Sequence, residues 1–106
     1  MSFELKPVRP ARPAKVDLSV VLPIYDEEES LHELLDNLFR ILDGLDRSYE
    51  IWCVNDGSRD RSSAILHEIA KQRHELCVLD FRRNFGQTAA LMAGFDHSRG
   101  DVIVTL

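Results

Sequence analysis

Residues 18–30, which read LSVVLPIYDEEES, decide the fold. The stretch opens with a largely apolar run, residues 18–22, which is typical of a buried strand. Pro23 has no backbone N–H to donate to a neighbouring strand, so it predicts the end of that strand. A helical pattern begins a few residues later. The stretch therefore predicts the strand, loop and helix that open an α/β sheet.

The same alternation continues to the end of the chain. The expected strands cover residues 16–22, 49–54, 76–81 and 101–106, and the expected helices cover residues 28–42, 61–73 and 87–97. Because crossovers between parallel strands are right-handed, this order predicts a Rossmann-like parallel sheet with helices on both faces. The expected strand order is 3-2-1-4, which places the first strand beside the fourth.

The first expected helix has one apolar face, and residues 27–29 are expected in its first turn, where the helix dipole favours carboxylates. The apolar face consists of Leu31, Leu34, Leu35, Leu38, Phe39 and Leu42. Gly44 is expected to end this helix, and Asp60 is expected to cap the next one. Gly94 lies inside the third helix, where glycine costs about 1 kcal/mol relative to alanine. It therefore predicts close packing against a neighbouring element.

Composition narrows the class of protein. The chain has 106 residues, of which 44% are hydrophobic and 29% charged, as expected for one small globular domain. The net charge of −5 argues against non-specific nucleic-acid binding. No run of about 18 apolar residues indicates a membrane span, and no apolar core near Met1 indicates a signal peptide. Cys53 and Cys77 lie in apolar runs without a partner motif, so buried free thiols are expected.

The two ends of the chain differ from its middle. Residues 1–16 are expected to form a flexible tail, because three prolines alternate with basic residues and no apolar face recurs. Residues 17–106 are expected to form the domain. The last six residues, DVIVTL, form an apolar strand without a following turn, so the chain is expected to be a fragment of a longer protein. Such an edge strand predicts self-association along residues 101–106.

Polar residues gather after the expected strands, where open α/β sheets bind their ligands. After the first strand, Tyr25 could stack on a planar base, and Glu27 could bind a hydroxyl or simply favour the helix dipole. After the second, Asp56 could accept from a base N–H or a ribose hydroxyl. The same stretch also fits a turn and a helix cap without any ligand.

The loop after the third strand offers basic and small residues. Arg82 and Arg83 could meet a phosphate, and Asn84 and Gly86 lie where the next helix begins, a natural place for an anion. These residues also fit a solvated turn. The G-x-G-x-x-G and G-x-x-x-x-G-K-[ST] motifs are absent, which disfavours the usual dinucleotide fold and a P-loop. The four histidines lack metal spacing and are expected in solvated positions.

Three stretches resemble a known family: LSVVLPIYDEEESL, YEIWCVNDGSRDRS and LDFRRNFGQTAALMAGFDHSRGDVIVTL. In this order and spacing they are similar to the amino-terminal half of family-2 glycosyltransferases with the GT-A fold. The third stretch most resembles the enzymes that load sugars onto polyprenyl phosphates. The resemblance implies inverting transfer from a UDP- or GDP-sugar to undecaprenyl or dolichyl phosphate, at the cytoplasmic face of a membrane. It also implies a divalent cation, Mg²⁺ or Mn²⁺, that offsets charge on the leaving diphosphate.

The resemblance carries over to particular residues. Pro23, Tyr25 and Glu27 match the family's first nucleotide-contacting motif, and Val54 and Asp56 match its second, around base and ribose. Two neighbours depart from the usual pattern, which has asparagine in place of aspartate at position 26 and aspartate in place of asparagine at position 55.

Arg83, Asn84 and Gly86 match a third conserved loop, which is expected near the diphosphate or in the packing of the sheet. No catalytic residue and no metal ligand is expected within the 106 residues, because the family's Asp-x-Asp motif follows the fourth strand and would come after Leu106. The chain alone is therefore expected not to catalyse transfer.

Other classes of protein fit less well. A non-catalytic nucleotide-binding module is the main alternative. A receiver-like phosphorylation domain would need a phosphoacceptor after the third strand, and Asp80 lies within that strand run. A purely structural module is a further alternative.

Overall fold

The structure is a computed structural model that describes residues 15–106. Seven elements alternate along it: β1 (Val16–Ile24), α1 (Leu31–Asp43), β2 (Tyr49–Asn55), α2 (Ser62–Gln72), β3 (Leu76–Asp80), α3 (Gln87–His97) and β4 (Gly100–Thr105). The tail expected in residues 1–16 lies outside the described residues except for Lys15 and Val16, and Val16 already belongs to β1.

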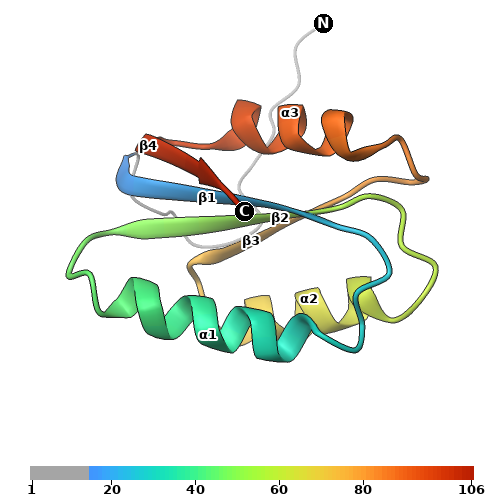
Figure 1. The fold of residues 1–106 in the computed structure, drawn as a ribbon, viewed down its shortest axis with the longest axis horizontal. Coiled ribbons are helices and arrows are strands. Elements are labelled where there is room, and N and C mark those ends of the chain that lie inside the picture. The colour runs from blue at the N-terminus through green and yellow to red at the C-terminus, as the bar shows by residue number, and fades with distance from the viewer. Residues whose placement is uncertain (1–14) are drawn as a thin grey trace, which may run out of the picture.

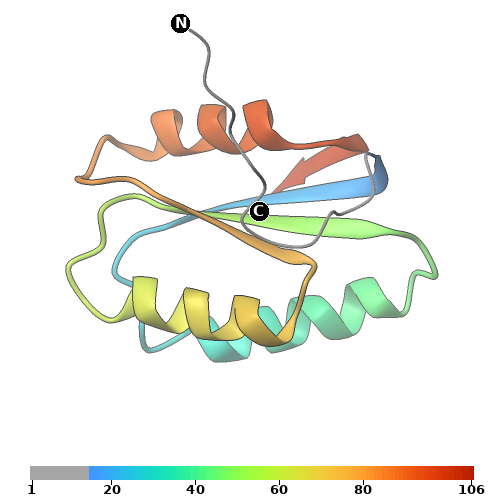
Figure 2. The same cartoon turned by 180° about the vertical axis from the view of Figure 1, so that it is seen from behind.

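The four strands form one sheet in the order β3-β2-β1-β4, with every neighbouring pair parallel. Helices α1 and α2 cover one face and α3 covers the other (Figure 1; Figure 2 shows the reverse view). The predicted α/β fold, strand order and two-sided cover are confirmed. Among the described residues, no helix is long and apolar enough to cross a membrane.

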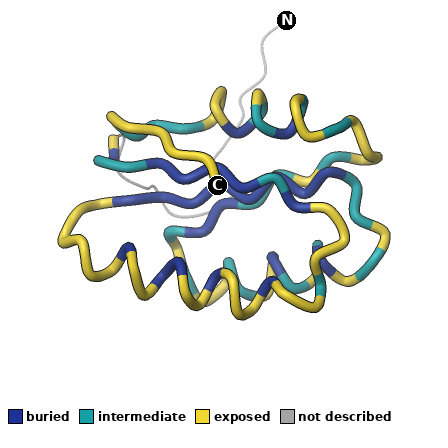
Figure 3. Tube along the Cα trace, in the orientation of Figure 1, coloured by how far each residue is buried: buried dark blue, intermediate teal, exposed yellow. Residues whose placement is uncertain are grey.

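The core has two unequal layers, because consecutive strand residues point to opposite faces of the sheet. The larger layer packs β1 and β2 against α1 and α2 around Leu35, Ile51 and Leu66, none of which is exposed. The smaller layer, beneath α3, is built on Val21, Trp52 and Cys77. Buried residues accordingly concentrate in the sheet and on the inner sides of the helices (Figure 3).

Two local predictions about packing are confirmed. A Cβ atom on Gly94 would lie 2.3 Å from Cγ1 of Val21, so only glycine lets α3 approach β1 this closely. Cys53 and Cys77 are buried and form no disulfide, and burial, helped by the neighbouring Cys77, raises the pKa of Cys53.

One prediction about the first strand is wrong, since β1 continues through Pro23 to Ile24. Pro23 pairs with Val54 of β2, whereas the pairing of β1 with β4 stops at Val21. Beyond Val21, β1 pairs with β2 alone among the residues that the structure describes, and proline is tolerated at such a position.

The predictions about the helix ends are partly wrong. Helix α1 begins at Leu31, so residues 27–29 precede it, and α2 has Arg61 rather than Asp60 as its N-cap. Asp60 still accepts a hydrogen bond from the backbone N–H of Ser62, the first residue of α2 (2.8 Å). Gly44 ends α1 as predicted.

The apolar face of α1 is narrower than predicted. Leu34 is 37% exposed, while the other five predicted core residues of α1 are buried. Ile41, seven positions after Leu34 and therefore on the same side of α1, is exposed as well.

A buried polar cluster fastens β4 to the sheet. The carboxylate of Glu50 accepts hydrogen bonds from Oγ of Ser19 (2.7 Å) and from the backbone N–H of Arg99 (2.7 Å). The same hydroxyl of Ser19 accepts from the backbone N–H of Gly100 (2.8 Å). The cluster therefore joins the central strands to the first residue of β4.

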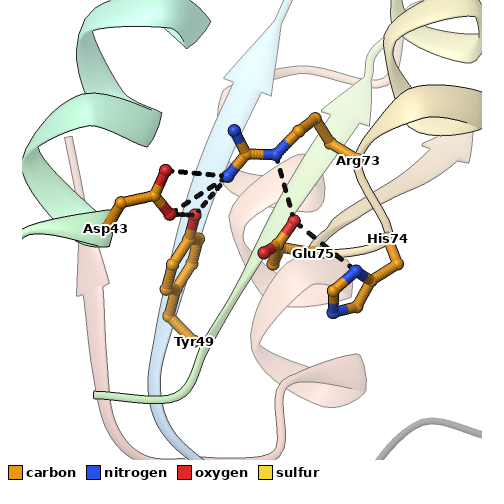
Figure 4. A network of polar contacts seen from close by, with 5 residues as sticks. All are labelled: Asp43, Tyr49, Arg73, His74 and Glu75. Carbon is orange, nitrogen blue, oxygen red and sulfur yellow. Dashed lines mark hydrogen bonds and ion pairs between the residues drawn. The ribbon is translucent and has the colours of Figure 1, made fainter. Parts of the chain in front are cut away.

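A second polar network lies at the amino ends of the strands (Figure 4). Arg73, at the end of α2, donates to both carboxylate oxygens of Asp43 (3.1 Å each), to the hydroxyl of Tyr49 and to Glu75. The hydroxyl of Tyr49 donates to Asp43 (2.6 Å), and burial together with this bond raises the pKa of Tyr49. The network ties α1 and α2 to the start of β2, at the edge of the sheet opposite to the loops described next.

Candidate functional site

Three loops meet at the carboxyl ends of the parallel strands. We name them the first loop (residues 25–30, after β1), the second loop (56–61, after β2) and the third loop (81–86, after β3). They lie together at the right-hand end of the sheet in Figure 1. This is the edge at which open α/β sheets bind their ligands.

The first and second loops are braced by hydrogen bonds in both directions. Consecutive backbone N–H groups of the first loop donate to side chains of the second loop and α2: Asp26 to Ser58 (2.9 Å), Glu27 to Ser62 (2.8 Å) and Glu28 to Asp60 (3.1 Å). In return, the backbone N–H groups of Arg59 and Arg61 donate to the carboxylates of Asp26 (2.7 Å) and Glu28 (3.1 Å). The carboxylates of Asp26, Glu28 and Asp60 therefore hold the loops together.

Asp56 joins the second loop to the third. Its side chain accepts hydrogen bonds from the backbone N–H groups of Phe85 (2.7 Å) and Gly86 (3.0 Å) and from the amide of Asn84 (3.2 Å). Asp56 is only 4% exposed. Both of its carboxylate oxygens thus serve the third loop, a role that the sequence did not suggest.

A pocket of about 240 Å³ opens between the loops and the start of α3. It is lined by Pro23, Ile24, Tyr25, Glu27, Asp56 and Gln87. Four of the five residues predicted to contact a nucleotide thus share one pocket. The fifth, Val54, is fully buried and pairs with Pro23 in the sheet.

The third predicted group does not line this pocket. Asn84 and Gly86 bind Asp56, and Arg83 lies exposed with its guanidinium 4.6 Å from the centre of the Phe85 ring. Gln87 is the residue that the sequence reasoning missed. Its position could have indicated this, because Gln87 is the first residue of a helix that follows a loop at the carboxyl end of a strand.

Asp80 is the last residue of β3, the outer strand next to β2, and lies at the same end of the sheet. Its carboxylate accepts from the amide of Asn55 (2.8 Å) and the hydroxyl of Ser63 (3.1 Å), and it contacts Nε2 of His67 (2.5 Å). Burial alone would raise the pKa of Asp80, but the bonds to His67, Asn55 and Ser63 lower it. Because Asn55, Ser63 and His67 already bind this carboxylate, Asp80 is not placed like the phosphoacceptor of a receiver-like domain. His67 and the other three histidines are exposed, as predicted.

The fold and the edge position of the pocket define the class: an open α/β domain with its ligand site at the carboxyl ends of parallel strands. Residues 19–106 match the family model described as glycosyl transferase family 2, and the chain belongs to this family.

The chain is similar to proteins named undecaprenyl-phosphate 4-deoxy-4-formamido-L-arabinose transferase. The one from Edwardsiella ictaluri is 46% identical over 90 residues, which cover 84% of this chain and 28% of that protein. The one from Pseudomonas paraeruginosa is 47% identical over 98 residues, which cover 90% and 29%. The chain therefore spans less than a third of the length of these relatives.

Solved structures confirm the GT-A fold class. The mannosyltransferase PcManGT from Pyrobaculum calidifontis, in complex with GDP-Man and Mn²⁺, superposes with a TM-score of 0.72 at 22% identity. The match covers 92% of this chain and 29% of that one. S. aureus TarS 1-349 gives a TM-score of 0.67 at 24% identity, over 84% and 27% of the two chains.

Proposed function

We propose that this chain forms the nucleotide-sugar-binding part of an inverting glycosyltransferase that transfers a sugar to undecaprenyl or dolichyl phosphate. The observation that carries the proposal is the shared pocket of Pro23, Tyr25, Glu27 and Asp56 at the ligand edge of the sheet. Relatives at 46–47% identity are named as sugar transferases that act on undecaprenyl phosphate, which supports the proposal. We place the whole enzyme at the cytoplasmic face of a membrane, where such an acceptor lipid would meet a nucleotide sugar.

The proposed roles follow from the walls of the pocket. Tyr25 is positioned to pack against the base, and the carboxylate of Glu27 to accept a hydrogen bond from a ribose hydroxyl. Pro23 and Ile24 form a rigid apolar wall, because both are paired with β2. The acceptor phosphate is already anionic, so its oxygen can attack the anomeric carbon without a general base, and the nucleoside diphosphate leaves.

A divalent cation, Mg²⁺ or Mn²⁺, is expected in the whole enzyme, where it would offset charge on the leaving diphosphate. The residues described here do not fit such a site: they include no group of three or more His, Cys, Asp or Glu side chains that could hold a metal. The resemblance places the ligands in the Asp-x-Asp motif, after the fourth strand. We therefore assign no step of the reaction to a metal bound by these residues.

Titration calorimetry of the 106-residue chain with UDP and with GDP tests the proposal. We expect one of them to bind, with an affinity that changes little when MnCl₂ is added. Absence of binding by both nucleotides would refute the proposal. Turnover of a nucleotide sugar by this chain alone would instead show that the reaction needs no further residues.

A non-catalytic nucleotide-binding module is the second candidate, because the pocket at the ligand end of the sheet could bind a nucleotide without any catalytic residue. This candidate makes the same binding prediction. The assay that separates the two is transfer to a polyprenyl phosphate by the whole protein. A module would bind the nucleotide without transferring the sugar.

Replacing Tyr25 with alanine is expected to weaken nucleotide binding about tenfold, because an aromatic side chain stacked on a base is worth about 1–3 kcal/mol. Phe95→Ala is the matched control. Tyr25 is 42% exposed and Phe95 is 39% exposed, but Phe95 lies on α3 outside the pocket. Equal losses in the two variants would show that Tyr25 does not contact the base.

We also propose that the chain self-associates along β4. Among the strands of residues 15–106, β4 pairs with β1 alone, and its exposed residues include Val102, Ile103 and Val104. Light scattering is expected to show a mass that rises with protein concentration. Val104→Lys should abolish the rise and Met92→Lys, at an exposed position on α3, should not. A monomer at every concentration would contradict the proposal.

A further inference from the structure

We infer that Asp80 is a positioning residue for the nucleotide pocket. It acts through the side chain of Asn55, which in turn holds the second loop against the first. This inference rests on the proposed nucleotide-binding function. Asp80 does not line the pocket, so its effect on the ligand is indirect.

Helix α2 and strand β2 fix the Asp80 carboxylate. Its Oδ1 accepts from the hydroxyl of Ser63 (3.1 Å) and from the amide of Asn55 (2.8 Å), and its Oδ2 contacts Nε2 of His67 (2.5 Å). Ser63 and His67 are four positions apart on α2, so both lie on the same side of that helix. Asp80 is therefore held at the end of β3 with one oxygen directed at Asn55.

Asn55 has one orientation in which both of its neighbours are satisfied. Its side chain is buried, since the residue is only 3% exposed. A carboxylate can only accept a hydrogen bond, and a backbone N–H can only donate one. The Nδ2 group of Asn55 must therefore face Asp80, which leaves its Oδ1 to accept from the backbone N–H of Ser58 (3.2 Å). Asp80 thus determines which way the buried amide points, and the amide fixes the turn of the second loop.

Ser58 passes this restraint to the first loop. Its hydroxyl accepts a hydrogen bond from the backbone N–H of Asp26 (2.9 Å). Asp26 has φ +50°, in the left-handed region that side chains disfavour, so its conformation needs support from the surrounding residues. Tyr25 and Glu27, on either side of Asp26, line the nucleotide pocket. Three consecutive hydrogen bonds thus connect Asp80 to the backbone that presents these two side chains.

An exchange of the two paired side chains tests the inference on the full 106-residue chain, with UDP and GDP as the titrated ligands. Asn55→Asp puts a carboxylate oxygen where the amide nitrogen lies 2.8 Å from Asp80, and like charges so close repel each other. We expect this variant to bind nucleotide about tenfold more weakly. Adding Asp80→Asn restores one donor and one acceptor in reversed order, so the exchanged pair should bind within about twofold of the native chain.

Two controls separate this pairing from a change of net charge. Asn37→Asp adds the same charge at an exposed position of α1 and should leave the affinity unchanged. Asn55→Asp combined with Glu68→Gln, at an exposed position of α2, restores the native net charge but not the pair, so it should bind as weakly as Asn55→Asp alone. Recovery of binding through Glu68→Gln would overturn the inference. An exchanged pair that binds no better than Asn55→Asp would overturn it as well.

Amide NMR of the same variants needs no ligand. In Asn55→Asp the backbone N–H signals of Ser58 and Asp26 should move, and in the exchanged pair they should return toward their native positions. Signals that stay in place in Asn55→Asp would refute the role of the pair. If the native chain binds neither nucleotide, the proposed function fails, and these signals still decide whether Asp80 positions the two loops.

Asp80→Ala covers the case in which Asn55→Asp does not fold. The side chain of Asp80 is 37% exposed, so its removal does not open a hole in the core. The Asn55 amide then loses the acceptor that orients it, and we expect about threefold weaker binding together with a shift of the Ser58 N–H signal. An unchanged affinity, or an unchanged Ser58 signal, would contradict the inference.

Discussion

Replacing Glu50 with alanine is expected to lower the free energy of unfolding by about 3 kcal/mol. Glu50 is only 2% exposed, yet its carboxylate accepts from Ser19 and from the backbone and guanidinium of Arg99. Removing a carboxylate from such a cluster leaves buried donors unpaired. Arg99 is 31% exposed and can regain some hydration, so the expected loss lies at the lower end of the usual range for buried ion pairs. Urea unfolding at pH 7 measures the change.

The loss should appear first in β4. The Glu50 cluster ties residues 99 and 100 to the two central strands, and in the described part of the chain the neighbour of β4 is β1 alone. Hydrogen exchange is therefore expected to accelerate along residues 100–105 before it does so in β2. Glu68→Ala is the control, because Glu68 is an exposed carboxylate near Lys71 and should not affect stability measurably. Similar destabilisation by both variants would contradict the expected role of Glu50.

The same carboxylate makes stability depend on pH. Burial alone would raise the pKa of Glu50, but the hydrogen bonds from Arg99 and Ser19 outweigh it and hold this pKa below its ordinary value. A lowered folded-state pKa gives stability that is fully present above the ordinary value of 4.5 and is lost as the pH falls through the folded pKa. The difference in stability between the native chain and Glu50→Ala should accordingly shrink below about pH 4. A constant difference from pH 7 to pH 3 would show that the ionised form is not what stabilises the fold.

The architecture could be predicted from the sequence because each local pattern agrees with the global fold. Apolar runs bounded by polar loops indicated four strands, and short connections left right-handed parallel pairing as the simplest arrangement. Gly94 could be predicted as a contact point because a glycine inside a helix has a local cost that packing must offset. The gathering of Tyr25, Glu27 and Asp56 at one edge followed from strand direction alone.

The features that the sequence did not predict depend on residues that are far apart in the sequence. Pro23 stays in its strand because it pairs with Val54 of β2, which lies 31 positions further along the chain. Ser58 and Ser62 accept from backbone N–H groups 32 and 35 positions away, and local sequence does not indicate such partners. Leu34 fits the helical pattern and is nevertheless exposed, because periodicity does not show which flank of a helix has a neighbour.

The contacts of Asp56 could not be predicted from the sequence for the same reason. A carboxylate directly after a strand can serve a ligand or the protein, and residue type and spacing do not separate the two. The structure shows that three donors of the third loop surround the Asp56 carboxylate. Those donors belong to residues 84–86, about thirty positions further along the chain.

Replacing Gly57 with alanine is expected to destabilise the fold by about 2–4 kcal/mol and to abolish nucleotide binding. Gly57 has φ +70°, a conformation that disfavours any side chain, and an added Cβ would lie 2.3 Å from the carbonyl carbon of Arg83 and 2.4 Å from the nitrogen of Asn84. Both contacts are to backbone atoms, so rotation of a side chain cannot relieve them and the third loop must move. Thermal unfolding and titration with UDP and GDP measure the two effects.

Two other glycines separate the causes of that loss. Gly44→Ala should be close to neutral, because Gly44 has an ordinary φ of −76° and an added Cβ would lie no nearer than 3.4 Å to any atom. Gly86→Ala should show backbone strain alone, since φ is +104° and no atom would lie within 4 Å of the added Cβ. If Gly57→Ala bound nucleotide as the native chain does, the close approach of the second and third loops would not matter for the pocket. Loss of binding in Gly57→Ala but not in Gly44→Ala would instead trace the pocket to this approach, because the same added methyl group is harmless where the backbone has room for it.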